Sequence, residues 1–68
     1  MVITDPKEKI MRARSEALVI AFVGEAASEG WWNSPNRAFD GISANAMWYI
    51  DPERVYNYLM SNASGDYL

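Results

Sequence analysis

The side chains that most often perform catalysis are missing from this sequence. It contains neither histidine nor cysteine, so the commonest general base and the strongest nucleophile are both absent. A metal ion would have to be held by oxygen ligands alone, and the carboxylates do not follow the spacing of a calcium loop. The sequence therefore predicts a protein that is not an enzyme and that uses no metal and no cofactor.

Two pairs of carboxylates are close enough along the chain to share a site. Glu25 and Glu29 are four residues apart and would lie on one face of a helix, where paired carboxylates can perform acid–base chemistry. The simpler interpretation is a solvated helix face. Asp51 and Glu53 are better explained as helix-start residues that interact with the helix dipole.

The charge distribution argues against a nucleic-acid partner. The formal net charge is −3, and residues 17–68 hold two bases against six acids. Neutralising phosphates requires clustered lysine and arginine. The other four bases lie near the start of the chain: Lys7, Lys9, Arg12 and Arg14. We interpret this group as the solvated face of the first helix, with contact to an acidic partner as the alternative.

The chain is expected to be cytoplasmic, without membrane contact. Its longest apolar run, residues 17–24, is far shorter than the roughly 20 residues that cross a bilayer. The same run lies behind too many charges to be a secretory signal.

The small size of the chain predicts that it associates with something. A domain of 68 residues buries only about 60% of the surface that its unfolded chain exposes, and without cysteine it has no disulfide. Half of the residues are hydrophobic, with three tryptophans and four tyrosines, which are enriched at interfaces. We therefore expect a homodimer or a hetero-oligomer.

The first predicted element is a long helix over residues 5–29, which Gly24 either bends or breaks. Asp5-Pro6-Lys7-Glu8 combines an N-cap, a first-turn proline and a capping-box glutamate. One stripe follows helical spacing: Ile10, Ala13, Ala17, Ala21 and Phe22. Other apolar residues widen it until the helix is apolar nearly all round, which predicts a helix covered on most sides or a dimer seam: Met11, Leu18, Val19, Ile20 and Val23. A strand over residues 17–23 is the alternative.

The remaining elements complete an all-α fold in a single domain, residues 1–68. Gly30 is predicted to end the long helix, and residues 30–42 to form a Trp/Pro/Asn loop. A short helix over residues 43–50 would be capped by Ser43.

A C-terminal helix is predicted over residues 51–63, followed by a tail over residues 64–68. Asp51-Pro52-Glu53 repeats the start signal of the first helix. Val55 and Leu59 should form the buried side of this helix, with Tyr56 and Met60 as further candidates.

The segment from Trp31 to Trp48 holds all three tryptophans and one of the two phenylalanines. Helical periodicity does not explain this aromatic density. The aromatic side chains either close the open end of a small helical core or form a binding surface.

Within that segment, Trp32-x-x-Pro35-Asn36-x-Ala38-Phe39-x-Gly41 resembles the W-L-x-x-P-N-x-A-L-x-G-x-x-P core of the Xre/MbcA/ParS-like antitoxin toxin-binding domain. The family pattern continues with a short helix, an acidic residue and a valine-containing helix that ends near a glycine, to which residues 51–59 and Gly65 correspond. The match covers roughly residues 17–68. The later proline of the pattern is absent, and Ala44 lies near its position. Too few residues precede the motif for the helix-turn-helix-like domain of full-length members, so the resemblance is to a stand-alone toxin-binding half.

This resemblance implies the antitoxin half of a type II toxin–antitoxin pair. The implied partner is a RES-domain toxin that degrades NAD, whose active-site cleft the domain would cover and whose substrate the chain end would block. The motif residues would shape the domain: Trp32, Pro35, Asn36, Ala38, Phe39 and Gly41. The last helix and tail would face the partner through Tyr58, Asp66, Tyr67 and Leu68.

Three other functions are compatible with the sequence. One is a small phage-type inhibitor of another host protein, since a toxin-binding half alone is what a mobile element can carry. Another is a self-associating structural module, as the apolar first helix suggests. A transcriptional regulator is least favoured, because acids outnumber bases and no DNA-binding domain precedes the motif.

The role of Trp32 can be tested by one substitution. If Trp32 belongs to the core, we expect Trp32→Ala to lower the free energy of unfolding by about 3 kcal/mol or more, measured by urea denaturation. Unchanged stability with lost partner binding would instead identify Trp32 as an interface anchor.

Overall fold

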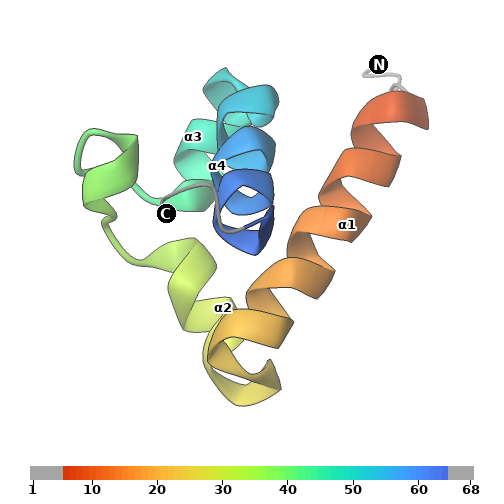
Figure 1. The fold of residues 1–68 in the computed structure, drawn as a ribbon. Helices are drawn as coiled ribbons and strands as arrows, with labels where there is room; N and C mark the ends of the chain where they lie inside the picture. Colours follow the sequence, from red (N-terminus) through yellow and green to blue (C-terminus); the bar gives the residue numbers. More distant parts are fainter. Residues whose placement is uncertain (1–5, 65–68) are drawn as a thin grey trace.

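The computed structural model of the chain describes residues 6–64 (Figure 1). The elements, in chain order, are α1 (Pro6–Val23), α2 (Glu25–Asn33), the 3-10 turn η1 (Arg37–Phe39), α3 (Ala44–Ile50) and α4 (Pro52–Ser64). Within these residues there is no strand, only one isolated antiparallel bridge between Pro35 and Ser43. The predicted all-α class is confirmed, and none of the described helices is both long and apolar enough to cross a membrane.

The helices pack around one shared hydrophobic core. In Figure 1, α1 runs along one side of the molecule, the chain turns back at its lower end, and α2 begins the opposite side. Helices α3 and α4 lie between these two arms, and α1 packs against both α2 and α4. The side chains that meet in this space therefore come from every helix.

Gly24 breaks the predicted long helix into two. Its φ of 91° and ψ of 156° lie in a region that is essentially restricted to glycine. Its N–H donates to Ile20 O at 2.8 Å and closes the last turn of α1. A Cβ at this position would meet nothing within 4 Å, so the backbone conformation alone requires glycine. Of the two expected outcomes, a bend or a break of the helix at Gly24, the structure shows the break.

Gly30 does not end the helix, so the predicted boundaries at residues 29 and 30 are wrong. Helix α2 continues through Gly30 to Asn33. Ser34 is extended, with φ −94° and ψ 148°, because a residue before proline is disfavoured in the helical region. Pro35 therefore ends α2, and the loop begins four residues later than predicted, with η1 inside it.

The predicted start signals of the later helices are confirmed. Ser43 caps α3, since its Oγ accepts a hydrogen bond from the Ala46 N–H at 3.1 Å. Pro52 is the first residue of α4, and Asp51 Oδ1 accepts from the Arg54 N–H at 3.4 Å. Pro6 likewise begins α1, whereas the predicted cap Asp5 lies outside the described residues.

Within the described part of the chain, the core consists of eight buried hydrophobic residues: Val19, Trp32, Phe39, Ala44, Met47, Trp48, Val55 and Leu59. The prediction for α4 is confirmed at Val55 and Leu59, and Tyr56 is half-buried. It is wrong at Met60, which is 42% exposed, because one residue beyond Leu59 the helix has turned by about 100°.

The predicted apolar stripe of α1 is not its buried face. All five of its residues are exposed: Ile10, Ala13, Ala17, Ala21 and Phe22. The core is reached instead by a neighbouring stripe: Met11, Ser15, Leu18 and Val19. Helix α1 packs against α2 and α4 and leaves the predicted stripe in solvent, so the interpretation of a central, wrapped helix is wrong.

Ser15 is the one polar side chain fully buried among the described residues. It is 0% exposed, and its Oγ has no hydrogen-bond partner there. A buried, unsatisfied hydroxyl costs about 1–3 kcal/mol. Ser15 lies on the buried face of α1 together with Val19.

We expect Ser15→Ala to raise the free energy of unfolding by about 1 kcal/mol, because the substitution removes the unsatisfied hydroxyl and improves helix propensity. Urea denaturation measures the change. Ser28→Ala is the matched control, since the Ser28 hydroxyl already donates to Glu25 O at 2.9 Å. A lower stability of Ser15→Ala would show that the hydroxyl has a partner.

Candidate protein-binding site

Asn36 organises the loop that follows α2. Its side-chain Oδ1 accepts from the Ala38 N–H at 2.9 Å and caps η1. Its backbone O accepts from the N–H groups of Phe39 and Gly41, each at 3.0 Å, and its own N–H donates to Ile42 O at 3.0 Å. One asparagine thus makes four hydrogen bonds that fold the loop back on itself.

The end of the same loop uses two residues in left-handed conformations. Asp40 has φ 60° and Gly41 has φ 86°, and glycine adopts such values without steric cost. Arg54 from α4 holds this turn: its guanidinium donates to Asp40 Oδ2 and to Ala38 O, each at 3.1 Å. Asn36 and Gly41 therefore shape the loop.

The loop delivers Phe39 to the core. Phe39 is 0% exposed. Its ring makes edge-to-face contacts with Trp31 at a centroid distance of 6.2 Å and with Tyr58 at 5.3 Å. Such pairs add about 0.5–1.5 kcal/mol beyond the burial of their area. The contact with Tyr58 ties the loop to α4.

Trp32 is a core residue and not an exposed anchor. It is 5% exposed and packs edge-to-face on Trp48 at 6.0 Å. The Arg12 guanidinium lies over its ring, 3.8 Å from the centroid. The interpretation of Arg12 as part of a solvated face is therefore wrong, because this cation–π contact turns its side chain inward. Lys7, Lys9 and Arg14 are exposed, as predicted.

Tyr58 lies in a hollow, which we call the aromatic hollow, between the ends of α1 and α4. The hollow has a volume of about 340 Å³ and is lined by Phe22, Trp31, Tyr58, Leu59 and Asn62. Phe22 is 48% and Tyr58 is 39% exposed. Accessible aromatic surface of this kind can receive an apolar side chain from another protein.

The structure places one of the four predicted partner-binding residues, Tyr58, in this hollow. The other three, Asp66, Tyr67 and Leu68, lie outside the described residues. Trp31 belongs to the aromatic segment for which a binding surface is one of the two expectations, whereas sequence reasoning missed Phe22 and Asn62 as lining residues. The signal for Asn62 was its place one helical turn after Tyr58, whereas nothing in the sequence joins Phe22 to α4.

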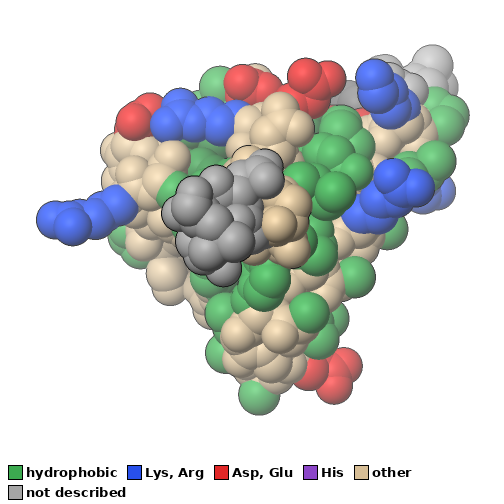
Figure 2. Space-filling view, in the orientation of Figure 1, with side chains coloured by type: hydrophobic (Ala, Val, Ile, Leu, Met, Phe, Trp, Pro, Cys, Tyr) green, Lys and Arg blue, Asp and Glu red, His purple; other side chains and the backbone are tan. Residues whose placement is uncertain are grey.

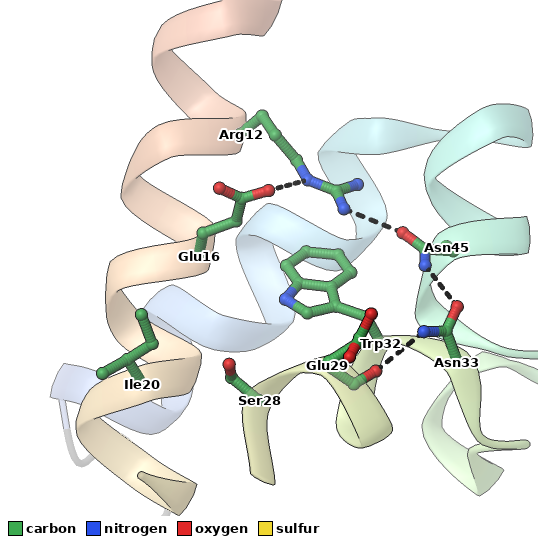
Figure 3. A pocket seen from close by; sticks show the side chains of 8 residues that line it. All are labelled: Arg12, Glu16, Ile20, Ser28, Glu29, Trp32, Asn33 and Asn45. Atoms are coloured by element: carbon green, nitrogen blue, oxygen red, sulfur yellow. Dashed lines mark hydrogen bonds and ion pairs between the residues drawn. The ribbon is translucent and has the colours of Figure 1, made fainter. Parts of the chain in front are cut away.

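A second hollow, which we call the polar hollow, also measures about 340 Å³. Figure 3 shows the eight side chains that line it: Arg12, Glu16, Ile20, Ser28, Glu29, Trp32, Asn33 and Asn45. Arg12 donates to Glu16 Oε2 at 2.9 Å and to Asn45 Oδ1 at 2.8 Å, and the Asn45 amide donates in turn to Asn33 Oδ1 at 2.8 Å. These bonds link α1, α3 and α2.

The carboxylate pairs do not form a metal site. Within residues 6–64, no group of three acidic side chains is placed to hold a metal ion. Glu25 and Glu29 are both exposed on α2, in keeping with a solvated face, and Glu29 also borders the polar hollow.

Comparison of the chain with protein-family models, curated proteins and solved structures finds no match. The antitoxin resemblance therefore rests on the motif residues alone and stays a prediction.

We expect Asn36→Ala to lower the free energy of unfolding by about 1–2 kcal/mol, because the Ala38 N–H loses its acceptor. Thermal or urea denaturation measures the loss. Asn36→Asp is the matched control: its carboxylate keeps an acceptor oxygen, so it should lose less. Equal losses in the two variants would mean that the capping bond does not stabilise the loop.

Proposed function

We propose that this chain acts by binding another protein at the aromatic hollow rather than by catalysis. The observation that supports the proposal most directly is the hollow itself, in which Phe22 and Tyr58 remain about half exposed beside the buried Leu59. Exposed aromatic side chains around a concave apolar surface are typical of binding hot spots. The lack of histidine and cysteine fits a binding role.

The partner that we propose is a RES-type NAD-degrading toxin, whose active-site cleft the domain would occlude. The motif resemblance supports this choice, and the order of the helices is compatible with it: α2, the Asn36 loop, α3 and α4 follow one another as the family pattern requires. The aromatic hollow lies beside the last turns of α4, the end of the domain that the resemblance assigns to the partner.

A second candidate is self-association through the outer face of α1. Ile10 is 55% and Ile20 is 41% exposed, and the exposed Ala13, Ala17 and Ala21 share that face. Figure 2 shows hydrophobic side chains exposed along α1. Packing two copies along this line would cover apolar surface that a small domain leaves in water.

We expect Tyr58→Lys to weaken binding to a co-expressed RES-domain protein at least about tenfold, because a charge in the aromatic hollow must be desolvated on binding. Binding is measured by calorimetry, and inhibition by NAD consumption. Tyr49→Lys is the matched control, because Tyr49 is 93% exposed, belongs to α3 and lies outside the hollow. This substitution should leave both the binding and the inhibition unchanged.

Loss of binding in Tyr49→Lys with retention in Tyr58→Lys would contradict the assignment of the hollow. Intact binding and inhibition after deletion of residues 65–68 would contradict the role given to the tail. A partner without NAD-degrading activity would favour the alternative of a phage-type inhibitor of another host protein.

A further inference from the structure

The polar hollow contains a hydrogen-bond donor, the Trp32 indole N–H, that has no partner among residues 6–64. Trp32 is 5% exposed, and among residues 6–64 no hydrogen bond involves its indole Nε1. In Figure 3 the indole nitrogen faces the space between Ile20 and Ser28. The nitrogen itself is not buried, since Ser15 Oγ is the one buried side-chain polar atom without a partner among the described residues, so an acceptor atom placed in the hollow can reach it.

The charges around this donor select the kind of ligand. Arg12 is held by its contact with the Trp32 ring, and its ion pair with Glu16 at 2.9 Å offsets that carboxylate. Glu29 has no ion pair within the described part of the chain. The hollow thus keeps one uncompensated negative charge, which attracts a cation and disfavours an anion.

The wall of the hollow also has an apolar part. Ile20 is 41% exposed at its edge. A long basic side chain has a hydrocarbon stem that lies along apolar surface while its charged end stays near water or a carboxylate. Ile20, the Glu29 carboxylate and the Trp32 indole N–H are three chemically different groups in the wall of the hollow. A ligand that contacts all three can bind in one orientation only.

We propose that the polar hollow binds a basic side chain of a partner polypeptide together with its adjoining peptide carbonyl. The cationic end pairs with Glu29, the stem lies against Ile20, and the carbonyl oxygen accepts from Trp32 Nε1–H. This site is separate from the aromatic hollow, since the two share no lining residue. It therefore goes beyond the function proposed above.

The experiment is an NMR titration of the ¹⁵N-labelled chain with N-acetyl-alanyl-lysyl-alanine amide. The indole Nε1–H signals report the tryptophans individually, and Trp32→Phe assigns the signal of Trp32. We expect a saturable shift of the Trp32 signal, larger than the shifts of Trp31 and Trp48. The same peptide with norleucine in place of lysine keeps the stem without the charge, and should bind about two- to five-fold more weakly.

Glu29→Gln should weaken the binding of the lysyl peptide by the same two- to five-fold, as expected for one exposed ion pair. Glu25→Gln is the matched control: it removes the same charge one helical turn away, outside the hollow, and should have less effect. Both positions are exposed, and an unchanged dispersion of the backbone signals confirms that each variant is folded.

A Trp32 signal that does not move at millimolar peptide would overturn the proposal, as would equal binding of the norleucine peptide. Spermidine carries positive charge but no carbonyl group, so it should leave the Trp32 signal nearly in place. An equal shift with spermidine would overturn the assignment of a polypeptide ligand.

Discussion

The packing of Trp32 is the contact on which the rest of this small structure depends. Its ring has the Arg12 guanidinium of α1 on its face and Trp48 of α3 against its edge, while its backbone belongs to α2. Three helices therefore meet at one side chain. The core formed by the described residues has only eight buried hydrophobic side chains, and so short a chain buries a low fraction of its surface, so the loss of this one contact removes a large part of the packing.

Features that depend on local backbone chemistry could be predicted from the sequence. Pro6, Ser43 and Pro52 mark helix starts where predicted, because capping and proline geometry act within one turn. The prediction that Gly30 ends a helix was wrong because the residue type alone does not determine the backbone conformation. A glycine ends a helix only when its backbone leaves the helical region, and here the following tryptophans continue α2 until Pro35 prevents it.

Features that depend on distant partners could not be predicted in this way. In α1 the apolar residues surround so much of the helix that periodicity does not decide which stripe is buried, and Ser15 occupies the inner face while Ile10 is outside. Arg12 was assigned to solvent because nothing near it in the sequence shows that it meets an indole 20 residues later. Of the candidate site, the motif pointed to the Asn36 loop and the resemblance named Tyr58, whereas Phe22 joins the aromatic hollow only through the turn at Gly24.

The two neighbouring tryptophans of α2 line different hollows, Trp31 the aromatic one and Trp32 the polar one. Successive side chains of a helix differ in direction by about 100°. Inserting or deleting a single residue between Gly24 and Trp31 would rotate both indoles away from their places at once. The length of this segment is therefore constrained by geometry even where its exposed alanines are free to vary, whereas α1 can gain or lose residues at its N-terminal end without moving either indole.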